Sequence, residues 1–153
     1  MMAEVMDVER AREVLAGQGF HCSQAVVMHA CEVLGLDKDL LLKVSGGLGG
    51  GCFHGDVCGC VSGAIMAIGA VYGYNQPYSK EQNAILVSKL KEFEAKFEEK
   101  HGSLLCRELL GGYSFADPEQ AKAIMTQGLT KNCPALVASA CEILDEIILP
   151  SDK

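Results

Sequence analysis

Residues 46–63 read GGLGGGCFHGDVCGCVSG, with eight glycines and three cysteines in eighteen positions. A loop this rich in glycine can bind a phosphate, hold a metal or pass close to a thiol, because glycine lets the backbone turn sharply and approach its neighbours. These functions require different partner residues. The rest of the chain therefore has to distinguish between them.

The stretch lacks the features of a phosphate-binding loop. Cys52 stands where a dinucleotide-binding G-x-G-x-x-G motif has its third glycine. No strand pattern precedes the glycines, and no Gly-Lys-Ser/Thr sequence follows them. We therefore expect no nucleotide cofactor. The chain also has no C-x-x-C-H sequence, so we expect no haem.

The sequence on both sides of this loop has helical character. Apolar residues recur at helical spacing, and no alternating strand pattern of any length is present. We predict an all-α protein, a single-domain helical bundle with a glycine-rich loop between helices. The domain is residues 1–153, with an N-terminal helix in 1–20 and a motif region over 22–148. Helices are predicted over residues 6–17, 23–34, 37–45, 57–78, 81–100, 103–110 and 134–148, with another beginning at Asp117-Pro118.

Local signals mark three of the helix starts. Asp37 suits an N-cap, and Asp117 followed by proline suits the start of a helix. Ser79 and Gln82 match a capping box, in which two side chains satisfy free backbone N–H groups. We expect helices to begin directly after these residues.

Residues 57–78 contain no charged side chain and are long enough to be considered as a membrane span. Several glycines and the absence of basic flanks argue against that interpretation. Gly59, Gly63 and Ala67 recur every four residues and allow a second helix to approach closely. We predict a central buried helix and no membrane span.

Composition excludes several classes of function. The net charge is −7 and no basic cluster is present, so nucleic acid and anionic membranes are not expected partners. The N-terminal sequence has no apolar stretch typical of a signal peptide. We expect a cytoplasmic location, where the eight cysteines are not structural disulfides.

The cysteines divide by position. Cys31 and Cys141 lie on apolar helical stripes and are expected to be small core residues. Cys22, Cys58 and Cys133 stand at or just before predicted helix starts, where free N–H groups and the helix dipole stabilise a thiolate. Cys106 precedes Arg107, whose guanidinium favours a thiolate if it turns inward.

Spacing leaves one local group of potential metal ligands. No C-x-x-C sequence is present, which excludes a thioredoxin-type motif and a zinc ribbon. Cys52, His54, Cys58 and Cys60 lie close together in sequence and offer soft ligands on a flexible backbone. A metal site, with zinc as the candidate ion, and a chance cluster both remain open.

Four segments together resemble a known family. HCSQAV, SGGLGGGCFHGDVCGCVSGAIMAIG, CRELLGG and NCPALV are similar to the redox-active proteins named for their C-GCAxxG-C-C pattern, and to the non-haem part of split-Soret cytochromes. The resemblance implies that the characteristic cysteines are Cys22, Cys58, Cys106 and Cys133. The chain departs from the family in having Cys60 where alanine is usual, and in adding Cys52.

The resemblance implies helical, redox-active thiol chemistry or an iron–sulfur centre, and it names no substrate. We predict a cytosolic redox protein in which the four family cysteines converge on one site for electron transfer with a redox partner. They either cycle between dithiol and disulfide or hold an iron–sulfur cluster. Gly51, Gly59 and Gly63 are the expected cofactor-binding glycines of this site. The loop glycines let the backbone pass close to thiols from other helices, and Gly59 and Gly63 allow close helix packing.

Two alternatives belong to other classes. One is a metal-binding or metal-delivery module without turnover, with Cys52, Cys60 and His54 among its ligands. The other is a structural helical bundle with inert thiols. We also expect a homodimer, because the uncharged segment 57–78 and the apolar helix 23–34 exceed what a domain of this size easily covers.

Overall fold

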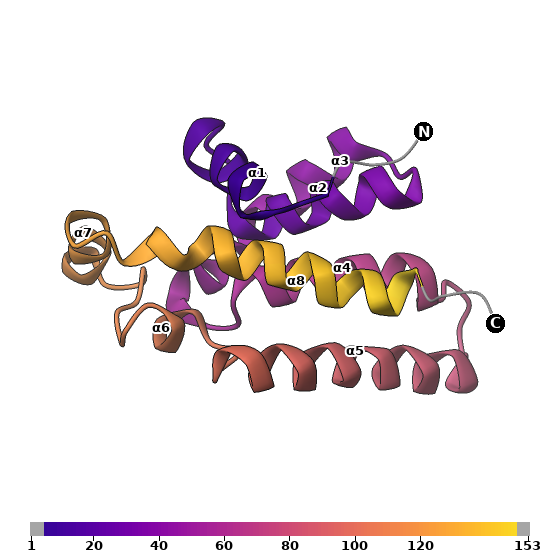
Figure 1. Cartoon of the computed structure of the whole chain (residues 1–153). Coiled ribbons are helices and arrows are strands. Elements are labelled where there is room, and N and C mark those ends of the chain that lie inside the picture. The colour runs from indigo at the N-terminus through magenta and orange to yellow at the C-terminus, as the bar shows by residue number, and fades with distance from the viewer. Residues whose placement is uncertain (1–4, 150–153) are drawn as a thin grey trace.

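The computed structural model describes residues 5–149, which are mostly helical (Figure 1). Residues 1–4 and 150–153, which the predicted domain includes, lie outside the described residues. Within residues 5–149 the only β-structure is an isolated antiparallel bridge between Val57 and Leu105, so the all-α prediction is confirmed. The helices are α1 (Val8–Arg12), α2 (Cys22–Leu34), α3 (Lys38–Ser45), α4 (Gly59–Tyr72), α5 (Lys80–His101), α6 (Cys106–Leu109), α7 (Pro118–Thr126) and α8 (Cys133–Ile148).

Helices α4 and α8 form the middle of the bundle, with α2 packed on one side and α5 on the other (Figure 1). Small and branched side chains fill the contact between them, and Val61, Ile68, Val137 and Leu144 are fully buried. Burial of this apolar surface drives the packing. The prediction that α4 is a central buried helix is therefore confirmed.

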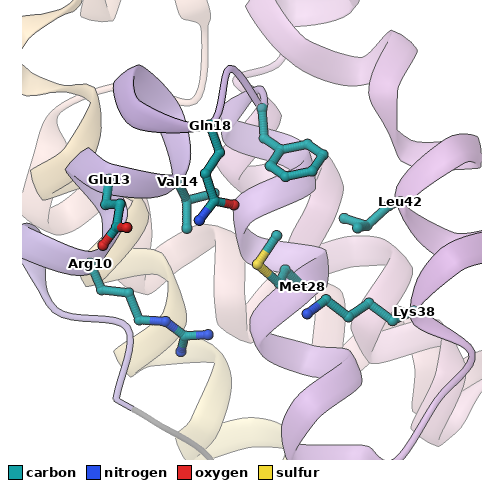
Figure 2. A pocket seen from close by; sticks show the side chains of 8 residues that line it. Arg10, Glu13, Val14, Gln18, Met28, Lys38 and Leu42 are labelled. Carbon is teal, nitrogen blue, oxygen red and sulfur yellow. The ribbon is translucent and has the colours of Figure 1, made fainter.

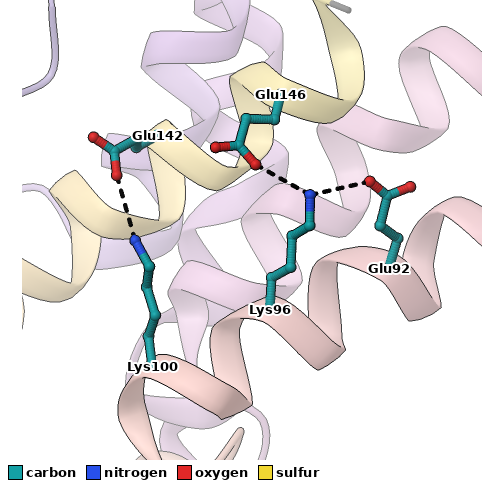
Figure 3. Close-up of polar contacts among 5 residues, drawn as sticks. All are labelled: Glu92, Lys96, Lys100, Glu142 and Glu146. Carbon is teal, nitrogen blue, oxygen red and sulfur yellow. Dashed lines mark hydrogen bonds and ion pairs between the residues drawn. The ribbon is translucent and has the colours of Figure 1, made fainter.

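Helix α5 covers the bundle with one apolar stripe. Phe93 and Phe97 are fully buried, and their rings stack with centroids 5.9 Å apart. At the edge of this contact, Lys96 Nζ lies 3.1 Å from Glu146 Oε1 on α8, and Lys100 Nζ lies 3.4 Å from Glu142 Oε1 (Figure 3). Exposed ion pairs such as these contribute little to stability.

Most helix starts agree with the local signals. The carboxylates of Asp37 and Asp117 accept hydrogen bonds from the backbone N–H groups of Leu40 and Glu119. The predicted capping box is wrong, because Ser79 Oγ donates to the carbonyl of Gln76 at 2.7 Å and makes no hydrogen bond to the helix. A preceding turn thus competes for the serine side chain.

Three helices are shorter than predicted. The helix expected over 6–17 is α-helical only at Val8–Arg12 and continues as a π-helical turn to Gly17. The helix expected over 57–78 ends at Tyr72, because Gly73 is extended with ψ at 173°. The helix expected over 103–110 contains only Cys106–Leu109, since the residues before it pair with the glycine-rich stretch. None of the helices within residues 5–149 is both long and apolar enough to cross a bilayer.

The glycine-rich stretch is more ordered than a simple loop. It contains a 3-10 turn, η2 (Gly46–Leu48), and a π-helical turn, η3 (Gly51–Gly55), between α3 and α4. A second π-helical turn, η1 (Glu13–Gly17), follows α1. Turns η2 and η3 place the glycine-rich backbone beside the first turn of α2, where the candidate site lies.

Candidate functional site

Three cysteines form one group at the start of two helices. The Sγ atoms of Cys22, Cys58 and Cys60 all lie within 4.8 Å of one another. Cys22 is the first residue of α2, Cys58 is the N-cap of α4, and Cys60 lies in the first turn of α4. Cys58 and Cys60 are buried and Cys22 is partly exposed. We call these residues the three-thiol group.

Glycine is required where α4 meets Cys22. A Cβ atom on Gly59 would lie 2.5 Å from Cys22 Sγ, and one on Gly63 would lie 2.8 Å from the carbonyl oxygen of Ser23. Real side chains do not approach so closely, so the two glycines allow α2 and α4 to touch through their backbones. The Ser23 hydroxyl is buried in this contact and donates to the carbonyl of Ser45 at 2.8 Å.

The glycine-rich stretch forms a tight turn that contacts the residue before Cys22. Gly51 has a φ of +64°, and a Cβ atom there would lie 2.4 Å from Asp56 N, so glycine is needed to close turn η3. Cys52 and Phe53 also have positive φ of 59°, a conformation that costs energy in residues with a side chain. This turn brings the Phe53 ring edge-on to His21, with centroids 5.1 Å apart.

Hydrogen bonding concentrates negative charge on one sulfur. The thiols of Cys58 and Cys60 donate to Cys22 and hold its pKa well below the usual value of a thiol, although burial acts in the opposite direction. Backbone N–H groups of Gly50 and Ser23 also bond to this sulfur. The same hydrogen bonds to Cys22 raise the pKa values of Cys58 and Cys60, with burial adding to the effect. These hydrogen bonds favour ionisation of Cys22 over that of Cys58 and Cys60.

Cys106 reaches this region through the backbone. The N–H of Cys58 donates to the carbonyl of Leu104 at 2.7 Å, and the N–H of Cys106 donates to the carbonyl of Asp56 at 2.7 Å. Burial and the negative charge of Cys22 raise the pKa of Cys106 to about 12. Arg107 donates to the carbonyl of Gly55 at 3.1 Å and to the Asp56 carboxylate at 3.2 Å, and it does not contribute to the pKa shift of Cys106. It therefore does not activate Cys106.

Cys133 is partly exposed at the first residue of α8 and packs against an apolar cluster that contains Cys106. Burial, with the charges of Cys22 and Cys106, raises its pKa to about 12. We expected helix starts to lower the pKa of Cys58 and Cys133 as well as that of Cys22. Only Cys22 shows this effect, because it alone receives hydrogen bonds from two other thiols and the loop backbone.

The remaining candidate residues lie elsewhere. Cys52 and His54 are exposed and do not belong to the three-thiol group. Cys31 and Cys141 are each 2% exposed in the helical core, as predicted, and burial raises both pKa values. All eight cysteines lie within residues 5–149 and none forms a disulfide.

Sequence reasoning did not identify two features of the site. It did not assign Gly50 a role, and it grouped Cys60 with Cys52 and His54 rather than with Cys22. The contact between Cys22 and Cys60 depends on how α2 crosses α4. Its sequence signal is the pair of glycines at positions 59 and 63, which are needed where the two helices touch.

A separate cavity of about 470 Å³ lies between α1, turn η1, α2 and α3 (Figure 2). No cysteine lines it. Its two basic residues both contact Glu32. The Arg10 guanidinium donates twice to that carboxylate at 2.8 Å, and Lys38 Nζ lies 3.6 Å from it. The side chains that line it are Arg10, Glu13, Val14, Gln18, Phe20, Met28, Lys38 and Leu42.

One protein family matches the chain over most of its length. The model of the family described as "Putative redox-active protein (C_GCAxxG_C_C)" matches residues 20–147. The matched range contains every cysteine of the chain. No curated protein and no solved structure matches it.

Proposed function

Because the chain belongs to the C_GCAxxG_C_C family, we propose that it is a thiol redox protein that alternates between free thiols and a disulfide joining Cys22 to Cys58. The observation that carries this proposal is the approach of three sulfurs to within 4.8 Å of one another. A disulfide holds its two sulfurs about 2 Å apart, so the proposal requires the side chains of Cys22 and Cys58 to move toward each other.

Cys22 is the proposed attacking thiol. Cys22 is the partly exposed residue of the three, and its lowered pKa favours the thiolate, the form that attacks disulfides. Attack on an oxidised partner forms a mixed disulfide and releases one partner thiolate. Cys58 then attacks the Cys22 sulfur and releases the second partner sulfur. Two electrons pass from the protein to the partner disulfide. Cys58 supplies the proton for one of the two partner thiols formed, and solvent supplies the proton for the other.

Cys58 is the proposed resolving thiol because it is the second cysteine of the family pattern. Cys106 and Cys133 are the proposed second pair of the same site. Their proximity to the Cys22 charge and their shared apolar cluster support this role. Since burial keeps both protonated, we expect them to react after Cys22.

The metal centres considered from the sequence stay predictions. Residues 5–149 bring three cysteine sulfurs within 4.8 Å of one another, and those of Cys106 and Cys133 are not among them. The zinc set of Cys52, His54, Cys58 and Cys60 is divided, because its first two members are exposed and outside the three-thiol group. We derive no electron-transfer step through either centre.

The cytosol is the proposed location, since a reducing compartment keeps such thiols available. The redox partner is proposed to be a protein or small-molecule disulfide. The homodimer remains a prediction from the uncharged segment 57–78. In the monomer α4 already contacts α2, α5 and α8.

The test is disulfide mapping. The full-length protein is equilibrated with reduced and oxidised glutathione over a series of potentials, quenched with an alkylating reagent and digested for mass spectrometry. We expect a peptide pair joining Cys22 to Cys58. The Cys58→Ala variant loses it, whereas Cys31→Ala, which removes a core thiol, keeps it.

Two results would overturn the proposal. One is that Cys22 stays reduced at every potential that oxidises the exposed Cys52. The other is that the disulfide formed by Cys22 is unchanged in amount and midpoint when Cys58 is replaced.

A further inference from the structure

The redox proposal uses two thiols of a group that contains three. We propose that Cys22, Cys58 and Cys60 together bind one monovalent copper ion through their three sulfurs. This site goes beyond the redox proposal, because it requires Cys60, which the Cys22–Cys58 disulfide does not use. The two proposals share thiols and are separable by experiment.

The ligand type and number select the ion. Thiolates are soft ligands that favour monovalent copper, zinc and iron–sulfur clusters among biological metals. Structural zinc sites are closed by four ligands in a tetrahedron. Residues 5–149 offer three sulfurs within 4.8 Å and no fourth histidine, cysteine or carboxylate at that distance. A three-sulfur site satisfies monovalent copper and leaves zinc one ligand short.

The surroundings suit the charge of such a complex. One monovalent ion with three thiolates carries two net negative charges, which are costly to bury without compensation. Here α2, of 13 residues, and α4, of 14 residues, both begin at the group, so the positive ends of two helix dipoles face the sulfurs. Backbone N–H groups of Gly50, Ser23 and Cys60 bond to sulfur in the group.

Backbone packing holds the ligands in place before any ion binds. Gly59 lies directly against Cys22 Sγ, and the first turn of α4 holds Cys58 and Cys60 two residues apart. An ion would enter beside Cys22, the partly exposed member of the group. Binding involves no oxidation or reduction, and the protons of the two neutral thiols leave to solvent.

The test is a competition titration under anaerobic conditions. Reduced full-length protein is titrated with monovalent copper buffered by bathocuproine disulfonate, and the copper coordination is measured by X-ray absorption. We expect one tightly bound ion per chain with three sulfur neighbours. Even the loss of a hydrogen-bond partner to a metal ligand costs about 10- to 100-fold in affinity, so Cys60→Ala is expected to weaken binding at least about 100-fold.

Cys31→Ala is the matched control. It removes a buried thiol outside the three-thiol group and should leave the copper affinity unchanged. Sulfur counting on the unmodified protein tests the site even if Cys60→Ala fails to fold. The proposal is overturned by two sulfur neighbours, by nitrogen or oxygen neighbours, or by Cys31→Ala weakening binding as much as Cys60→Ala. If Cys60→Ala binds copper weakly but still forms the Cys22–Cys58 disulfide, the copper site and the redox proposal are tested independently.

Discussion

Helix α2 has a cysteine in each of two different regions of the molecule. At its start, Cys22 lies in the three-thiol group and hydrogen bonds lower its pKa. Nine residues later, Cys31 lies in the helical core, 2% exposed, and burial raises its pKa. The same side chain on the same helix thus has opposite properties. Position relative to the helix start, and the groups that donate to the sulfur, determine which applies.

The two regions are also held together differently. The core around Phe93 and Phe97 is stabilised by burial of large apolar side chains. The thiol region depends on backbone contacts that only glycine permits, at Gly59 and Gly63. We therefore expect substitutions in the core to affect mainly stability, and substitutions in the thiol region to affect mainly sulfur reactivity.

The largest expected effect is that of Phe93→Ala. The ring is fully buried and stacks on Phe97, so its removal leaves a cavity and should cost roughly 3–5 kcal/mol of unfolding free energy. Urea unfolding followed by circular dichroism measures this loss. Ile85→Ala is the control, because Ile85 is on the same helix and 50% exposed.

In the folded fraction of Phe93→Ala, the alkylation rate of Cys22 should match that of the unmodified protein. A parallel loss of Cys22 reactivity would show that the core and the thiol region are not separate. Equal destabilisation by Phe93→Ala and Ile85→Ala would contradict the assigned core.

Gly59→Ala is expected to destabilise the protein less than Phe93→Ala does and to slow the reaction of Cys22 more. The added Cβ would lie 2.5 Å from Cys22 Sγ and must push the sulfur away from its hydrogen-bond donors. Overpacking of this kind costs about 1–3 kcal/mol. The pKa of Cys22 should rise, so its alkylation at neutral pH should slow at least about tenfold.

Gly69→Ala is the matched control on the same helix, since nothing lies within 4 Å of a Cβ atom at that position. It should leave Cys22 unaffected and stabilise the protein by about 0.5–1 kcal/mol. If both variants leave Cys22 alkylation unchanged, the close contact at Gly59 has no role in the site.

Sequence reasoning reached the helices because their causes are local. Apolar spacing predicted the bundle, and Asp37 and Asp117 accept the expected N-cap hydrogen bonds. The capping box predicted at Ser79 is wrong although its signal is equally local. The carbonyl of Gln76 accepts the hydrogen bond from the Ser79 hydroxyl instead. A nearby competing acceptor is invisible to a motif that considers only the helix.

The site was predicted less completely. The start of α2 and the start of α8 were both expected to favour a thiolate, yet only Cys22 has a lowered pKa. The difference comes from donors brought by the crossing of α2 and α4 and by Gly50 of the turn above them. These contacts join residues far apart in sequence, so no local pattern contains them.

Comparison of Cys22 with Cys133 tests the central claim most directly. Each begins a helix and each is partly exposed, but only Cys22 receives hydrogen bonds from other thiols. The measurement is the pH dependence of alkylation at each cysteine, followed by peptide mass spectrometry on the reduced protein.

Because its pKa is lowered, Cys22 should still be a thiolate at pH values below the usual pKa of a thiol. Cys133 should ionise only as the pH approaches about 12. At pH 7 we predict alkylation of Cys22 more than about 100-fold faster than that of Cys133. Similar rates at pH 7, or a Cys22 rate that rises only above pH 9, would contradict the account.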